Sequence, residues 1–125
     1  LVFIDLDNFK YINDNFGHAA GDRVLKEFAS LLKEYCRKAD LYARLSGDEF
    51  VILFTDLNTS ECETIMQRLL QSFCNLPSSF TGQSILSFSY GIADFSGQQP
   101  CSLAKLLAVA DSRMYNAKVQ KKAQL

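Results

Sequence analysis

The fold of this chain follows from one stretch, RLSGDEFVILF, at residues 44–54. The apolar-rich run 41–45 and the aromatic and β-branched run 50–54 flank four polar residues, and Gly47 suits a turn that needs a positive φ. This pattern predicts a β-hairpin with a polar tip. The adjacent carboxylates of Asp48 and Glu49 repel each other unless a metal ion or another cationic group lies opposite. A solvated polar turn is the alternative explanation.

The rest of the chain alternates strand and helix patterns around this hairpin. We expect a strand at 1–4 that ends in acids, helices at 9–16 and 19–38, hairpin strands at 40–45 and 48–55, a helix at 60–74, a second hairpin at 80–83 and 84–95, and a helix at 102–119. Asp7 and Asn8 can cap the short helix, and the buried stripes of the long helices include Ala29 and Leu103. This order favours an α+β fold of ferredoxin-like kind, with helices on a mostly antiparallel sheet.

Composition limits the classes of function. The 125 residues suffice for a single domain, 1–125, and because the chain starts in mid-strand we expect it to be truncated and excised from a larger protein. The 13 basic and 14 acidic residues give a net charge of −1, which argues against nucleic acid as a partner. No run is apolar enough to cross a bilayer, so we expect no membrane contact. Four cysteines without a Cys-x-x-Cys spacing suggest reduced thiols and a cytoplasmic location.

Acidic residues at two strand ends suggest a metal site. In the expected sheet, the end of the first strand lies beside the hairpin tip, which would bring Asp5 against Asp48. Two carboxylates and the Leu6 carbonyl would form a hard oxygen site suited to Mg²⁺ and a bound phosphate. Paired metals at such a site can activate a hydroxyl and hold a leaving pyrophosphate.

Local cationic and polar groups could recognise a nucleotide. Backbone amides near Asn8 and Phe9 form a plausible anion site at a helix start. Four lysines are available for phosphates, namely Lys10, Lys118, Lys121 and Lys122. Asn13 and Asp22 could read a guanine edge. Taken singly, each residue has a structural alternative, because a C-terminal Lys complements the helix dipole, Asn13 can be helix surface and Asp22 a helix cap.

Together these motifs resemble the GGDEF domain of diguanylate cyclases. The resemblance rests on FIDLDNFK (3–10), ND (13–14), FGHAAGD (16–22), SGDEF (46–50), YGIA (90–93) and ADSRMYNAK (110–118), which span nearly the whole chain. It implies a nucleotidyl cyclase-like, palm-type sandwich. It also implies that two facing domains of a homodimer join two GTP molecules into cyclic di-GMP and release two pyrophosphates.

The resemblance also implies residue roles. Metal ligands (Mg²⁺ or Mn²⁺) would be Asp5, Leu6 and Asp48, and Glu49 would have a supporting catalytic role. Phosphates would be held by Asn8, Phe9, Lys10, Lys118 and Lys122, and guanine by Asn13 and Asp22. Arg37 and Asp40 match an Arg-x-x-Asp motif for inhibition by the product, and Arg68 stands where a second product-binding arginine is often found. A charged helix end is the alternative for this motif.

Two departures keep other functions open. Ser46 replaces the family's first glycine, and Lys121-Lys122-Ala123 stands where the family tends to have Gly-Arg-Asn or Gly-Lys-Asn. An active cyclase is the first hypothesis. The second is a catalytically silent GGDEF-type domain that binds GTP or cyclic di-GMP and regulates an attached phosphodiesterase (EAL) or other domain, with sensor modules elsewhere in the protein. The third is an unrelated ferredoxin-like interaction module.

Overall fold

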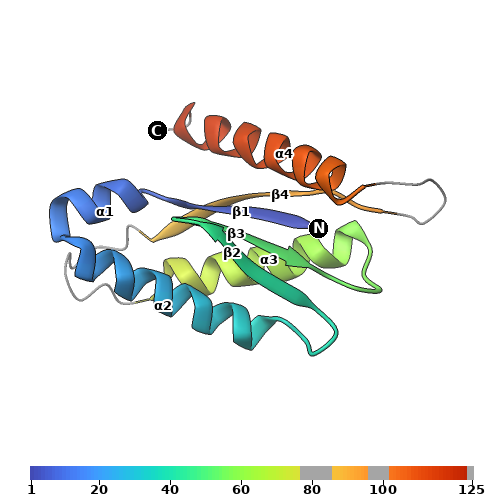
Figure 1. Cartoon of the computed structure of the whole chain (residues 1–125), viewed down its shortest axis with the longest axis horizontal. Coiled ribbons are helices and arrows are strands. Elements are labelled where there is room, and N and C mark those ends of the chain that lie inside the picture. Colours follow the sequence, from blue (N-terminus) through green and yellow to red (C-terminus); the bar gives the residue numbers. More distant parts are fainter. Residues whose placement is uncertain (77–85, 96–101, 124–125) are drawn as a thin grey trace.

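A computed structural model describes residues 1–76, 86–95 and 102–123 of the chain (Figure 1). The elements in order are β1 (Val2–Asp7), α1 (Phe9–Phe16), α2 (His18–Tyr35), β2 (Leu41–Ser46), β3 (Glu49–Leu53), α3 (Thr59–Cys74), β4 (Ser87–Ile92) and α4 (Leu103–Ala123). This order confirms the expected α+β class. The predicted strand at 80–83 lies outside the described residues.

The four strands form one antiparallel sheet in the order β2-β3-β1-β4. The central strand β1 has Ile4 opposite Phe50 on one side and Tyr90 on the other. One residue further on, Asp5 lies opposite Glu49 and Ser89. Because side chains alternate across a sheet, Ile4 enters the core on one face and Asp5 lies on the other.

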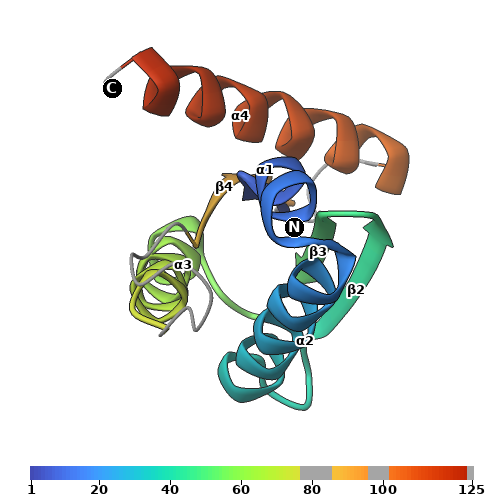
Figure 2. The same cartoon turned by 90° about the vertical axis from the view of Figure 1, so that its left-hand side faces the viewer.

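Helices cover the two faces of the sheet unequally. Figure 2 shows α2 and α3 on one side of the sheet and α4 on the other. Under α2 and α3 the core is aromatic. The ring of Phe28 meets those of Phe50, Phe73 and Phe88 edge to face, with centroids 4.8, 5.1 and 5.5 Å apart. These buried rings fix the sheet against both helices.

On the other face, α4 approaches the backbone of β4 directly at Gly91. A Cβ atom at this position would overlap the Ala110 carbonyl oxygen and the Met114 amide nitrogen. The small core on this side also contains Phe3 and Ala93. The lack of a side chain at Gly91 therefore sets the distance between α4 and the sheet.

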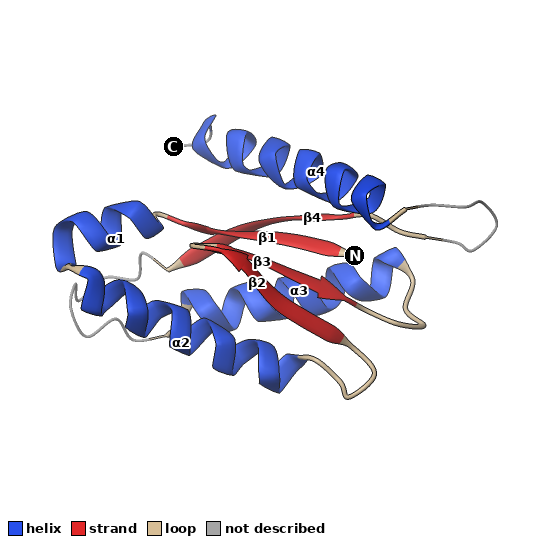
Figure 3. Ribbon diagram, in the orientation of Figure 1, coloured by secondary structure: helices blue, strands red, loops and turns tan. Residues whose placement is uncertain are grey.

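Several predicted boundaries are wrong (Figure 3). The first strand continues through the acidic residues to Asp7, α2 ends at Tyr35 rather than residue 38, and α4 runs to Ala123 rather than 119. Ala29 is exposed, and so is Leu103, with 60% of its surface accessible, although both were expected inside. The amphipathic spacing identified the helices. It did not predict which helical residues the sheet covers.

The strand β2 is the least covered element of the sheet. All six of its residues are exposed, including Leu41, which is 65% accessible. It pairs with β3 through a register shift between Arg44 and Ser46. Within the described ranges, no helix is both long and apolar enough to span a membrane.

Candidate functional site

The hairpin tip is fixed beside the end of β1 by the backbone. The Leu6 amide donates to the Asp48 carbonyl at 3.0 Å, which extends the pairing of β1 into the turn. Gly47 adopts φ +23°, and the Arg44 Nε donates to its carbonyl at 2.9 Å. These contacts bring the side chains of Asp5 and Asp48 together, as the sequence predicted.

The electrostatics of Asp5 are those of an incompletely compensated carboxyl. Its pKa is raised from 3.8 to about 6, first by burial and then by the facing Asp48 carboxyl, while Lys118 acts in the opposite direction. The Lys118 Nζ lies 3.2 Å from Asp5 Oδ2. A single lysine therefore does not offset burial and the like charge.

The Asp5 side chain has an atom suited to a cation. Its Oδ1 is buried and finds no hydrogen-bond partner in the described part of the chain. An unpaired buried carboxylate oxygen that faces a second carboxyl fits Mg²⁺, which prefers oxygen ligands. Among residues 1–76, 86–95 and 102–123, no group of three or more His, Cys, Asp or Glu could hold a metal. Two carboxylates would thus need further oxygens, such as the Leu6 carbonyl and ligand phosphates.

The start of α1 offers backbone amides next to this pair. Asn8 is the N-cap residue and has a left-handed conformation, with φ 62° and ψ 15°. Asn8 is thus at the expected capping position, but its side chain makes no capping hydrogen bond. Phe9 is half-buried against the core and Lys10 is exposed. The first amides of a helix lack intrahelical partners, which makes them available to an anion.

The two predicted guanine readers come from adjacent helices. Gly17, at φ +89°, turns the chain between α1 and α2. The Asn13 side chain lies so close to Gly21 that a Cβ atom there would overlap its amide oxygen. Asp22 follows Gly21 and is exposed. The structure thus places the Asn13 amide beside Gly21, the residue that precedes Asp22.

The lysines at the end of α4 differ in their availability. Lys121 Nζ donates to Asp7 Oδ2 at 2.8 Å, to the Phe88 carbonyl at 2.8 Å and to Ser87 Oγ at 3.0 Å. These bonds use all three donors of the ammonium group. Lys121 is therefore engaged within the fold, whereas Lys122 is exposed.

Sequence analysis missed two polar contacts near the carboxyl pair. The Ser46 hydroxyl donates to Glu49 Oε2 at 3.1 Å, so the residue that departs from the family motif holds the neighbouring acid. Ser89 Oγ donates to Asp7 Oδ1 at 2.9 Å inside the fold. The alternation of Asp5 and Asp7 on one strand face was a signal for the second contact.

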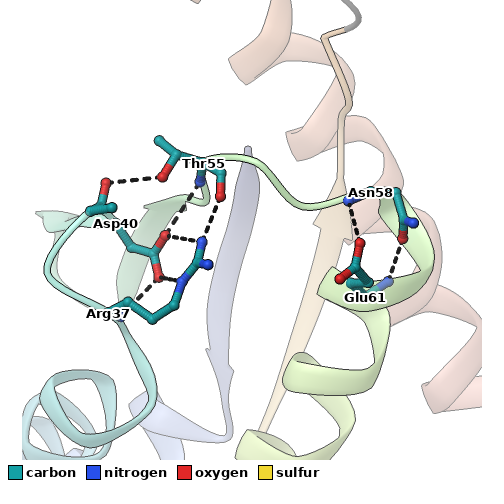
Figure 4. Close-up of polar contacts among 6 residues, drawn as sticks. Arg37, Asp40, Thr55, Asn58 and Glu61 are labelled. Atoms are coloured by element: carbon teal, nitrogen blue, oxygen red, sulfur yellow. Dashed lines mark hydrogen bonds and ion pairs between the residues drawn. The ribbon is translucent and has the colours of Figure 1, made fainter.

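A separate polar corner joins the end of α2 to the end of β3 (Figure 4). Asp40 accepts from the Arg37 amide at 2.8 Å, from Arg37 Nη2 at 3.0 Å and Nε at 3.2 Å, and from the Thr55 amide at 3.3 Å. Burial opposes ionisation of Asp40, but these donors outweigh it and lower its pKa. Arg37 Nη2 also donates to the Thr55 carbonyl at 2.5 Å.

Arg68 belongs to α3. It lines an open groove of about 960 Å³ along α3, together with residues such as Thr64 and Gln71. Over the part of the chain that the structure describes, no hydrogen bond or ion pair joins Arg68 to Arg37 or Asp40. The site formed by Arg37, Asp40 and Arg68 stays a prediction.

Comparisons with known proteins agree with the fold. Residues 1–124 match the family described as "Diguanylate cyclase, GGDEF domain". The chain is 42% identical over 128 residues to diguanylate cyclase DgcN of Escherichia coli, and the match covers 100% of the chain and 31% of DgcN. It superposes on the GGDEF domain of PA1120 (YfiN or TpbB) from Pseudomonas aeruginosa with a TM-score of 0.84 and 39% identity, over 95% of this chain and 74% of that one.

A third similar structure is the GGDEF domain of DgcB from Caulobacter crescentus, which was solved in complex with c-di-GMP. It has a TM-score of 0.82 and 25% identity, and the match covers 95% of this chain and 71% of that one. The fold and the sequence thus define the class of GGDEF domains, which generally use a divalent metal. This chain belongs to the diguanylate cyclase GGDEF family.

Proposed function

We propose that this chain is the catalytic domain of a diguanylate cyclase, which condenses two GTP molecules into cyclic di-GMP and two pyrophosphates. In each of the two steps a ribose hydroxyl of one GTP forms a bond to the α-phosphorus of the other, and the bond to pyrophosphate breaks. The observation that carries the proposal is the buried, unpaired Oδ1 of Asp5 beside Asp48. Membership in the family supports it.

In this proposal Asp5, Asp48 and the Leu6 carbonyl hold Mg²⁺ or Mn²⁺. The bound metal would stabilise negative charge on the phosphates and favour ionisation of the attacking hydroxyl. Lys118 now neutralises Asp5 Oδ2 at 3.2 Å. With a cation in that role, the Lys118 ammonium would be free to bind a phosphate. Glu49 supports the site from its position opposite Asp5 in the sheet register.

The remaining residues would bind the nucleotide. The amides near Asn8 and Phe9 and the exposed Lys10 would hold phosphates at the start of α1, and Lys122 would contribute from α4. Asn13 and Asp22 would read the guanine, with the Asp22 carboxylate accepting from the ring N–H and exocyclic amine.

Each domain would supply half of the reacting centre, so the active form would be a homodimer. The chain spans 17% of the length of one curated relative and 31% of another. We therefore propose that it works within a longer cytoplasmic protein, or within the cytoplasmic part of one, that carries sensor or EAL domains.

Product formation tests the proposal. The full-length protein, incubated with GTP and Mg²⁺, should form cyclic di-GMP, and Asp48→Ala should abolish this activity. Asp111→Ala, which removes an exposed carboxylate on α4, is the matched control and should retain it. Absence of product from the folded wild-type dimer at saturating GTP would contradict the proposal.

Ser46 favours one second candidate, a GGDEF-type domain that binds GTP without turnover and regulates an attached domain. Its side chain lies in the signature turn, where it bonds to Glu49. GTP binding without product, together with an altered activity of the attached domain, would support this candidate over the cyclase.

We further propose feedback inhibition by cyclic di-GMP at Arg37, Asp40 and Arg68. The Arg37 side chain remains 49% exposed although it pairs with Asp40, so one edge of its guanidinium is open to a ligand. Arg37→Ala and Arg68→Ala should each weaken product binding measured by calorimetry. Unchanged product binding in a folded Arg37→Ala variant would contradict this site.

A further inference from the structure

The contacts of Lys121 suggest a role that a phosphate-binding lysine would not have. Its three donors are directed to acceptors on two strands, Asp7 on β1 and Ser87 and Phe88 on β4. Only 10% of the Asp7 side chain is accessible, and its second oxygen accepts from Ser89. Lys121, whose side chain is 42% accessible, is thus part of a polar cluster that joins the last turns of α4 to the sheet.

A second acid–lysine pair lies beside this cluster. Asp5 and Asp7 alternate on the same face of β1 and therefore both face α4. Lys118 and Lys121 are three residues apart and therefore lie on one side of α4. Lys118 pairs with Asp5, and Lys121 pairs with Asp7. Two adjacent ion pairs thus join β1 to α4.

The segment of α4 that carries Lys118 is held at both ends. On its N-terminal side, Ala110 and Met114 lie against Gly91 without room for a side chain. On its C-terminal side, Lys121 is bonded to both strands. Rotation or lift of α4 at residue 118 would break one of these contacts.

We propose that Lys121 and Asp7 are a positioning pair that sets the location of Lys118 for the triphosphate. This inference rests on the proposed function, because it assumes that Lys118 binds a phosphate. Lys121 does not touch the nucleotide and acts through Lys118. When the Asp5–Lys118 pair opens on substrate binding, the Asp7–Lys121 pair stays closed and keeps α4 in place. The glycine that the family resemblance predicts at residue 121 could not make these contacts.

A double-mutant cycle in the full-length protein tests the proposal, with a GTP analogue that has a methylene bridge between its α and β phosphates. Lys121→Met should weaken binding of the analogue about tenfold, because a charge-assisted contact that fixes Lys118 is lost. Lys118→Met should weaken binding at least as much. The double variant should bind no more weakly than Lys118→Met alone, because Lys121 acts only through Lys118. Lys105→Met, an exposed lysine on the same helix, is the matched control.

The outcomes separate this inference from the proposed function. Wild-type affinity in Lys121→Met, or losses that multiply in the double variant, would overturn the positioning role. Wild-type affinity in Lys118→Met would remove Lys118 from the proposed function and the inference with it. If Lys121→Met does not fold, Asp7→Asn keeps the shape of the cluster and removes its charge. Asp7→Asn should weaken binding of the GTP analogue about threefold when Lys118 is present, and should have no effect in the Lys118→Met background.

Discussion

Two carboxyls of this domain, the buried Asp40 and the partly buried Asp5, have opposite surroundings. Asp40 accepts four hydrogen bonds from Arg37 and Thr55, and its pKa is lowered. Asp5 has one lysine, a facing carboxyl and an oxygen without a partner, and its pKa is raised to about 6. The first carboxyl already stabilises the fold. The second lacks such compensation, which is the difference we would expect between a structural acid and the metal-binding acid proposed above.

The largest expected effect comes from removing the charge of Asp5. Asp5→Asn should lower cyclic di-GMP formation by about a thousandfold, because metal coordination supplies several kcal/mol to such reactions. The same variant should unfold at the same or a higher urea concentration at pH 8, since the folded environment disfavours the ionised form. Clear destabilisation would contradict the description of Asp5 as an uncompensated acid.

The same substitution at Asp40 should have the opposite effect on stability. Asp40→Asn weakens the bonds to Arg37 and Thr55, and we expect a loss of about 2 kcal/mol in the free energy of unfolding. Urea denaturation measures it, and Asp111→Asn on the surface of α4 is the control. A loss no larger than that of the control would show that the corner at Arg37 is not structural.

Acid should affect the two carboxyls in opposite directions. Because the pKa of Asp5 is 3.8 in the unfolded chain and about 6 in the fold, its contribution to stability falls as the pH rises through this window. The contribution of Asp40, whose pKa is lowered, is instead lost as the pH falls. Below pH 6, protonation of Asp5 should weaken Mg²⁺ binding by about tenfold per pH unit. Titration calorimetry of Mg²⁺ binding between pH 5 and about 8 tests this expectation, and an affinity that does not change with pH would contradict it.

The smallest expected effect concerns Ser46. Ser46→Gly frees Glu49 and removes a side chain from the turn, and we expect product formation to rise about two- to fivefold. Ser46→Ala keeps the Cβ atom and removes the hydroxyl, so it separates the two causes. Equal activity of the wild type, Ser46→Gly and Ser46→Ala would show that the hydrogen bond to Glu49 does not affect product formation.

The sequence predicted the elements better than their contacts. The spacing of apolar residues predicted the helices, and the hairpin pattern predicted that Asp48 lies beside Asp5. The start of α3 was missed by one residue, because Asn58 and Glu61 form a reciprocal capping box that begins the helix at Thr59 (Figure 4). The polar cluster around Lys121 depends on the distance between α4 and the sheet. One residue, Gly91, sets this distance, and hydrophobic periodicity does not encode it.

Because β2 is exposed, we expect Asp5 and Asp48 to differ in backbone mobility. Asp5 belongs to the central strand, whose amides should exchange with deuterium only on global unfolding. Asp48 follows a strand whose six residues are all exposed, and the amides of that strand should exchange far more often. Any ligand that bridges the two acids would therefore find one of them fixed in advance and would itself have to immobilise the other, at a cost in affinity.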